Sequence, residues 1–241
     1  MIAADQPTIF GDKVLAVLSS KEDGNLKFGL GNDDETLANR RAFLGKAGID
    51  IAHTSLVGIT YDTDDFAKYR VALAKDKAVG MLRTDMDRHV DALVVTQPGH
   101  ALFLPLADCA GAVLYDPVKK VLMVSHLGRH SVEQRGAKKS VEYLKEQLDV
   151  NPRDLQVWIS PSVGSATYPL HAFDGRSLQA VIVEQLREAG VSSAGIEAST
   201  VDTASDANYF SHSEYLKGNE AKAGRFAVVA MMMPGQGEPA N

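Results

Sequence analysis

Short runs of apolar residues separated by polar turns recur along most of the chain. Runs of this kind, bounded by Gly, Pro, Asn or Asp, are typical of buried β-strands. They predict strands over residues 14–19, 49–59, 91–96, 101–106, 111–115, 121–125, 155–159, 196–201 and 226–232. The middle strands are closely spaced and are punctuated by turns at Gln97-Pro98-Gly99 and Asp116-Pro117. We therefore expect an antiparallel meander between residues 91 and 125.

The first helix predicted from apolar spacing lies between the first two strands. It is expected to open at Asp33 or Asp34, whose carboxylate can accept free N–H groups, and to end at Gly48. The stripe that would face the core carries Leu37, Arg41 and Leu44.

Two further helices are predicted in the second half of the chain. One covers residues 131–150, with a capping box between Ser131 and Gln134, and the other covers residues 174–189. Residues 61–88 are rich in charge and weakly periodic, which predicts an exposed excursion with one short helix at most. Hairpins mixed with isolated helices indicate the α+β class rather than a doubly wound parallel sheet.

Composition and charge narrow the class of protein. The 241 residues are 45% apolar and 23% charged, as in a folded globular chain, and we expect one domain over residues 1–241. The net charge of −6 argues against a nucleic-acid partner. The longest apolar run, residues 226–233, is far shorter than the roughly 20 residues of a membrane-spanning helix, so no membrane partner is expected. A single cysteine and an N-terminus without a signal-peptide pattern predict a cytoplasmic protein.

The strongest candidate for chemistry is Cys109, which follows Ala107-Asp108 in a polar break between two apolar strands. His126 ends the next apolar run, and a hairpin turning at Asp116-Pro117 would bring it back beside Cys109. A thiolate next to an imidazole can bind zinc, or can act as nucleophile and base. A lone cysteine is also commonly a small buried apolar residue, and a histidine at a strand end is commonly an ordinary hydrogen-bonded residue.

Several short motifs, in this order along nearly the whole chain, resemble the laccase-domain or YfiH-type family, whose older name is multicopper polyphenol oxidase. They are Asn39-Arg40, His53, residues 91–96, Ala107-Asp108-Cys109, Asp116-Pro117, His126 with Gly128, Pro161 and Gly164, Tyr209-Phe210-Ser211, and Gly224-Arg225. The resemblance implies a layered α/β/β/α sandwich of class α+β, with mostly antiparallel or mixed sheets and a zinc pocket at the strand ends.

The resemblance also implies a metal site and an activity. By their match to the family, His53, Cys109 and His126 would bind one zinc ion, leaving the fourth position for water or substrate. The implied reaction is the phosphorolysis of adenosine, inosine or methylthioadenosine, with purine nucleoside and phosphate as substrates, together with adenosine deamination. One Cys and two His are too few for several copper ions, so copper laccase chemistry is not expected.

The stretch that follows His126 departs from the family. The family usually reads His-Ala-Gly-Trp-Arg-Gly there, whereas residues 126–131 read HLGRHS, so the Trp is absent and the arginine is displaced to Arg129. The predicted catalytic residues are Arg129 and Asp108, and the predicted substrate contacts are Asn39 and Arg40. Two alternatives stay open: a cysteine hydrolase or amidase that uses Cys109 with His126, and a zinc-binding protein without catalytic activity.

Overall fold

The computed structural model describes residues 1–82 and 89–235 and arranges their strands in two sheets. The four-stranded sheet has the order β1 (Val14–Leu18), β10 (Phe226–Met232), β5 (Ala101–Leu106) and β2 (Thr54–Leu56). The six-stranded sheet has the order β3 (Tyr69–Val71), β4 (Ala92–Val95), β7 (Val121–Leu127), β6 (Ala110–Asp116), β8 (Gln156–Ile159) and β9 (Ile196–Ala198). Both sheets are mixed: β2 runs parallel to β5, β3 to β4 and β9 to β8, and the other pairs are antiparallel.

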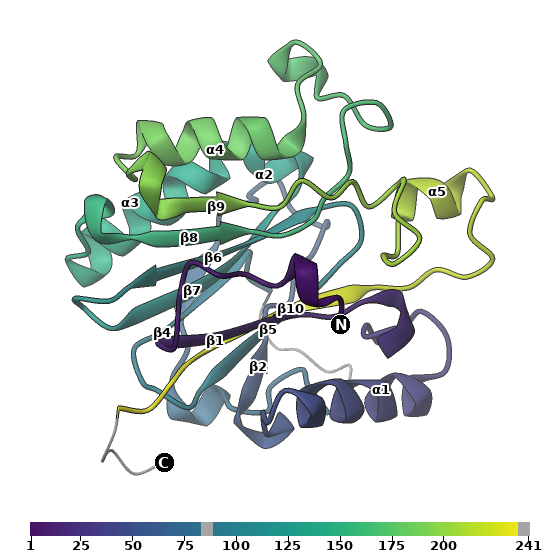
Figure 1. The fold of residues 1–241 in the computed structure, drawn as a ribbon, viewed down its shortest axis with the longest axis horizontal. Helices are drawn as coiled ribbons and strands as arrows, with labels where there is room; N and C mark the ends of the chain where they lie inside the picture. The colour runs from purple at the N-terminus through teal and green to yellow at the C-terminus, as the bar shows by residue number, and fades with distance from the viewer. Residues whose placement is uncertain (83–88, 236–241) are drawn as a thin grey trace.

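Helices cover the outer face of each sheet, which gives four layers (Figure 1). α1 (Asp33–Lys46) packs on the four-stranded sheet, and α2 (Arg129–Glu133), α3 (Gly136–Leu148) and α4 (Leu178–Glu188) pack on the six-stranded sheet. This arrangement confirms the predicted α+β sandwich with mixed sheets. In the described part of the chain, no helix combines the length and the apolarity needed to cross a membrane.

Short helices connect the layers. α5 (His212–Leu216) lies in the loop that leads into β10. The 3-10 helices are η1 (Ala3–Asp5), η2 (Lys21–Asp23), η3 (Ile51–His53), η4 (Ala74–Asp76), η5 (Pro152–Asp154), η6 (His171–Phe173) and η7 (Ser193–Gly195). The excursion predicted over residues 61–88 therefore contributes β3 and η4, and its last six residues, 83–88, lie outside the described residues.

The continuous apolar runs follow from this layering. On β5, Leu102 and Leu104 face the core between the two sheets, whereas Ala101 and Phe103 face α1. Successive side chains of a strand point to opposite faces, so a strand covered on both sides must be apolar at every position. The same reasoning applies to β6 and β7, whose residues are all buried.

The predicted hairpin at Asp116-Pro117 is confirmed, because β6 pairs with β7 in a register that sets Gly111 opposite His126. The predicted meander is wrong before that point. β4 pairs with β7 and β5 pairs with β10, so the turn at residues 97–99 carries the chain from one sheet to the other. Its Gly99 has a φ of 75° and donates its N–H to the Met232 carbonyl at 3.0 Å, which fixes the turn against β10.

Two of the helix predictions change in detail. α1 is capped by Asn32, whose side chain accepts the N–H groups of Asp34 and Glu35. Of the predicted stripe only Leu44 is buried, and Thr36, Arg40 and Phe43 complete the buried face. The helix predicted over residues 131–150 is broken, because Arg135 adopts a left-handed conformation with a φ of 63°. Ser131 consequently lies inside α2 and forms no capping box.

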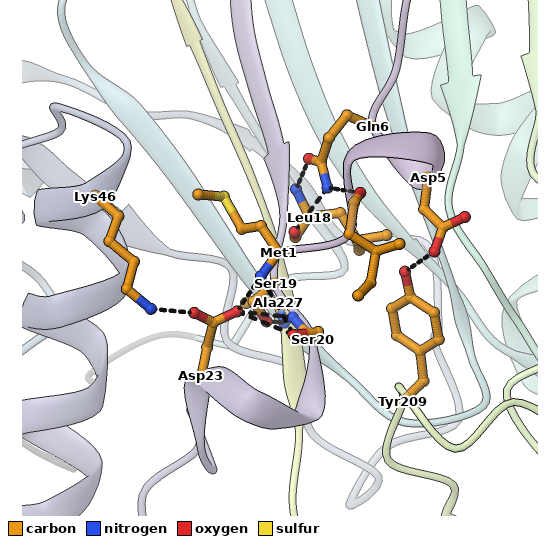
Figure 2. Close-up of polar contacts among 11 residues, drawn as sticks. Met1, Asp5, Gln6, Leu18, Ser19, Ser20, Asp23, Lys46, Tyr209 and Ala227 are labelled. Carbon is orange, nitrogen blue, oxygen red and sulfur yellow. Dashed lines mark hydrogen bonds and ion pairs between the residues drawn. The ribbon is translucent and has the colours of Figure 1, made fainter.

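The segment before β1 is tied to the rest of the molecule by polar contacts (Figure 2). The Gln6 side chain accepts the Leu18 N–H at 2.7 Å and donates to the Leu18 carbonyl at 3.1 Å. The buried Asp23 carboxylate accepts the N-terminal ammonium at 3.0 Å. The Tyr209 hydroxyl donates to Asp5 at 2.5 Å, so this segment also anchors the loop that leads to α5.

Candidate functional site

A cavity of about 330 Å³ opens where β5 ends and the chain turns into β6. Its wall includes the side chains of Cys109 and His126, the two residues that the β6–β7 hairpin was predicted to bring together. Tyr61, Lys27 and Arg225 also line it, although each comes from a different and distant part of the sequence. The site is therefore assembled at the end of the four-stranded sheet from at least four separate segments.

The backbone between β5 and β6 holds Cys109 in place. Asp108 has a φ of 74°, a left-handed conformation that the surrounding hydrogen bonds must support. Gly128, directly after β7, lies so close that a β-carbon there would be 2.9 Å from the Cys109 Sγ and 3.4 Å from the His126 Nε2. The thiol and the imidazole thus converge on Gly128, and any larger side chain at this position would push into them.

Tyr61 lies beside this pair. Its hydroxyl is 3.9 Å from the Cys109 Sγ, and its ring meets the His126 ring edge-on with centroids 6.5 Å apart. The segment that carries it is held by Gln134, which accepts the Phe66 N–H at 3.0 Å and donates to the Asp64 carbonyl at 2.6 Å. Sequence reasoning missed Tyr61. No local signal singles it out, since Phe66 and Tyr69 are aromatic residues of the same charged stretch.

His126 is buried, yet neither ring nitrogen has a hydrogen-bond partner in the described part of the chain. Burial, helped by the nearby positive charge of Lys27, lowers the pKa of His126 to about 4, so the ring is neutral at pH 7. Burial also raises the pKa of the Cys109 thiol, which stays protonated. Burial therefore disfavours a preformed thiolate–imidazolium pair at this site.

Lys27 and Arg225 bring positive charge to the cavity wall. Both side chains are half-buried, and burial lowers the pKa of each below its usual value. Neither forms an ion pair with any residue that the structure describes, although the charge of Asp108 lies close enough to favour the Arg225 cation. Asn25 positions both: its side chain bonds the backbone of Lys27 at 2.8 and 3.1 Å and accepts the Arg225 N–H at 3.0 Å.

Asp108, one of the predicted catalytic residues, lines the cavity, but its carboxylate is already engaged. Oδ1 accepts the Thr203 hydroxyl at 2.9 Å, and Oδ2 accepts the Ser213 N–H at 2.6 Å. Its backbone carbonyl also accepts the Val163 N–H at 2.9 Å. Through these contacts Asp108 connects the loops that carry Val163, Thr203 and Ser213 to the cavity wall.

Arg129, the other predicted catalytic residue, lies on the cavity wall and is exposed. Its guanidinium is 3.1 Å from the His130 Nε2 and 3.9 Å from the Glu133 carboxylate. The His130 ring stacks on Phe66 with centroids 4.7 Å apart and an interplanar angle of 18°. With Tyr61, these rings give the cavity an aromatic side.

The predicted substrate contacts Asn39 and Arg40 do not line the cavity, and the structure corrects their role. Arg40 is buried in α1, where it donates to the carbonyls of Leu26 and Gly80, both at 2.8 Å. Asn39 donates to the Asn25 carbonyl at 3.2 Å. Both residues therefore support the loop that carries Lys27.

His53, the predicted third zinc ligand, is not brought to the site. It is exposed and directly precedes Thr54, which pairs with Ala101 at the start of β5. Because β2 runs parallel to β5, His53 lies at the opposite end of β5 from Cys109, roughly 17 Å away at about 3.3 Å per residue. The segment that follows β2 runs toward the other end of β5, where Tyr61 comes to lie beside Cys109.

The donors at the site do not fit the predicted three-ligand zinc centre. The unpartnered nitrogens of His126 and the adjacent Cys109 thiol are two suitable donors. Among residues 1–82 and 89–235, however, no group of three His, Cys, Asp or Glu side chains could hold a metal ion. The Tyr61 hydroxyl lies beside the sulfur instead, 3.9 Å away, and a phenol is protonated at neutral pH. A protonated phenol is a poor zinc ligand.

Comparison with known proteins agrees with this fold. Residues 18–174 and 171–233 match the model of the family described as multi-copper polyphenol oxidoreductase laccase. The purine nucleoside phosphorylase YlmD of Bacillus subtilis (strain 168) is 31% identical over 91 residues, which cover 38% of this chain. The chain matches only 32% of the length of that relative.

Two solved structures share the architecture. The hypothetical protein YfiH of Bacillus licheniformis superposes with a TM-score of 0.82 and 22% identity, covering 91% of this chain and 92% of the other. YlmD from Geobacillus stearothermophilus gives a TM-score of 0.82 and 19% identity, covering 95% and 94%. Since the family model spans most of the sequence and the layered fold is the same, this chain belongs to the multi-copper polyphenol oxidoreductase laccase family, the YfiH-type family that its motifs resemble.

Proposed function

We propose that this chain is a purine nucleoside phosphorylase that binds a nucleoside and inorganic phosphate in the cavity beside Cys109 and His126. The observation that carries the proposal is the pair of cations, Lys27 and Arg225, on the wall of a partly apolar cavity. Hydrogen phosphate is a dianion, and guanidinium and ammonium groups are its usual partners in proteins. The name of the B. subtilis relative supports a purine nucleoside as the second substrate.

The aromatic side of the cavity suits a purine. Tyr61, Phe66 and His130 present ring faces and edges to it, with His130 already stacked on Phe66. Planar bases bind to such surfaces by stacking, which adds to the burial of apolar area. In this arrangement the base lies against the rings and the phosphate lies between Lys27 and Arg225. The ribose lies between the base and the phosphate.

The reaction needs no atoms beyond the two substrates. An oxygen of hydrogen phosphate forms a bond to the anomeric carbon of the ribose while the bond from that carbon to the base nitrogen breaks. The base leaves with the electron pair of that bond and takes the proton of the hydrogen phosphate, which gives free base and ribose 1-phosphate. Lys27 and Arg225 hold the attacking dianion, and the neutral His126 and Cys109 line the wall near it.

Arg129 and Asp108 have different roles in the proposed reaction. Arg129, exposed at the cavity, is available to contact the ribose or the phosphate as they enter. Asp108 acts as a positioning residue, because both of its oxygens accept hydrogen bonds from other loops. The donors of the described residues at the site do not form a three-ligand set through which zinc would activate water, so we propose neither zinc nor the deamination of adenosine. A cytoplasmic location stays a prediction.

Release of free base measured with and without phosphate tests the proposal. Purified protein is incubated with adenosine, inosine or methylthioadenosine, and base and sugar product are separated by chromatography. We expect base release that requires phosphate and yields ribose 1-phosphate, or its methylthio form, in equal amounts. Base release without phosphate, or none with any of the three nucleosides, would contradict it. In the second case, nucleoside binding by calorimetry would favour the non-catalytic alternative.

A further inference from the structure

Two features of the cavity act against a metal cation at Cys109 and His126. The first is the donor set. Catalytic zinc sites in proteins are built from three protein ligands with a fourth open position. Here a thiol and an imidazole converge near Gly128, and the next group around them is the Tyr61 hydroxyl, 3.9 Å from the sulfur. At that distance the Tyr61 hydroxyl is within hydrogen-bonding reach of the sulfur, so it fills the space beside the thiol that a third ligand would need.

The second feature is charge. Lys27 and Arg225 line the same cavity, and both act electrostatically on the Cys109 sulfur. A divalent cation bound between Cys109 and His126 would be repelled by two half-buried cations that lack ion-pair partners in the described part of the chain. Such repulsion is strong where solvent is partly excluded. The same two cations attract an anion.

The backbone holds both cations where they are. Asn25 ties Lys27 and Arg225 to each other through their main chains, and Arg40 holds the adjacent Leu26 carbonyl at 2.8 Å. The Lys27 loop is thus braced from α1 and from the start of β10. A cation cannot displace Lys27 from the cavity by a simple loop movement without breaking these bonds.

We infer that the Cys109–His126 pocket of this chain excludes divalent metal and selects an anion, with Tyr61 closing the third ligand direction and Lys27 supplying positive charge in place of an ion. The inference concerns the same cavity as the proposed function, but it does not depend on turnover. Metal content can be measured whether or not the protein cleaves nucleosides, so a failure of one is distinguishable from a failure of the other.

Zinc content and zinc affinity test the inference. The full chain is purified with added zinc, dialysed against metal-free buffer and analysed by atomic absorption, and zinc binding is titrated against a fluorescent indicator. We expect far less than one zinc per wild-type chain. The Tyr61→His variant is expected to bind zinc at least roughly tenfold more tightly, because it completes a set of one thiolate and two imidazoles. Tyr61 lies in a surface bend and is 58% exposed, so this segment can adjust to the shorter side chain.

Matched variants separate the two features. Adding Cys109→Ser to Tyr61→His should abolish the gained affinity, and adding Lys27→Met should increase it further by removing the repulsion. Tyr61→Phe should stay without zinc, and circular dichroism and thermal melting confirm that each variant is folded. About one zinc per wild-type chain, lost in Cys109→Ser, would overturn the inference. A folded Tyr61→His variant without a gain in affinity would overturn the role of Tyr61, and no effect of Lys27→Met would overturn the role of charge.

Discussion

A buried histidine lies at each end of β5, and the two differ in whether they have a hydrogen-bond partner. At the start of the strand, the Ser55 Oγ lies 2.7 Å from the His100 Nε2 and donates to the Asp76 carbonyl at 2.6 Å. Ser55 and His100 are buried and satisfy each other. At the other end, His126 is equally buried but both of its nitrogens lack partners in the described residues, and it faces a cavity.

This difference in hydrogen bonding indicates that His126, rather than His100, is the functional histidine. Nearly all buried polar groups in proteins have hydrogen-bond partners, so a buried imidazole without one needs an explanation, whereas a serine next to a histidine does not. A serine and a histidine at 2.7 Å resemble a nucleophile and its base. Here the serine proton is directed to a backbone carbonyl, so Ser55 and His100 brace the structure.

The largest effect is expected at the Cys109 end, from removing either cation. Lys27→Met or Arg225→Met should lower kcat/KM for phosphate about 100-fold, or about 3 kcal/mol in transition-state stabilisation, because each holds the attacking dianion. Steady-state kinetics with varied phosphate measures this loss. Lys145→Met, on the exposed face of α3, is the matched control and should behave as wild type. A loss that leaves the KM for phosphate unchanged would argue against an anion site.

The next effect is on stability at low pH and involves both ends of β5. Burial lowers the pKa of His100 to about 4, and the same holds for His126, against 6.5 for an unburied histidine. The unfolded chain therefore binds more protons between these values. Stability is complete above about pH 6.5 and falls as the pH is lowered toward 4, by about 2 kcal/mol per histidine at pH 5.

Urea unfolding at about pH 7.5 and about pH 5 measures this decline. In the His100→Gln variant the decline should be about 2 kcal/mol smaller, because one of the two titrating groups is gone. An unchanged pH dependence in that variant would mean that His100 is not held neutral in the folded protein.

A smaller effect is expected from removing one hydroxyl at the His100 end. Ser55→Ala should lower the free energy of unfolding by about 1–2 kcal/mol, because it leaves the buried His100 nitrogen without its partner and removes one of the hydrogen bonds to the Asp76 carbonyl. Activity should not change. Ser131→Ala is the matched control: its buried hydroxyl has no partner in the described residues, so its removal should cost nothing. Equal losses in the two variants would contradict the distinction between satisfied and unsatisfied groups.

The smallest effect is expected at His53. His53→Ala should change the free energy of unfolding by less than about 0.5 kcal/mol, since the residue is exposed. Base release and metal content should match those of the wild type. A loss of bound zinc in this variant would restore His53 as a ligand.

Local patterns predicted much of the fold. The apolar runs of β1, β5, β6, β7 and β10 appear nearly where expected, because a strand buried on both faces has a strong sequence signal. Pairing between sequence neighbours was also predictable, and the β6–β7 hairpin brought Cys109 to His126 as expected. The sheet to which each strand belongs was not, since β4 and β5 differ by pairing with distant strands.

The cations and Tyr61 were beyond prediction for the same reason. Lys27 and Arg225 are 198 positions apart and meet through Asn25 (225 − 27 = 198). Arg40 was predicted to contact substrate, yet its guanidinium lies over the Phe28 ring at 4.1 Å and is buried. Burial lowers the pKa of Arg40 to about 10, and no spacing rule anticipates a cation in the core.

The sequence by itself determined which segments form buried strands and that a thiol meets an imidazole, because the first depends on local apolar runs and the second on a hairpin closed within 18 residues, 109 to 126. Only the tertiary structure decided what surrounds that pair. The parallel register of β2 on β5 carries His53 to the far end of the strand and delivers Tyr61 in its place, and the contact between the Lys27 loop and β10 adds two cations. Contacts between distant segments follow from the packing of whole sheets, which no local pattern encodes.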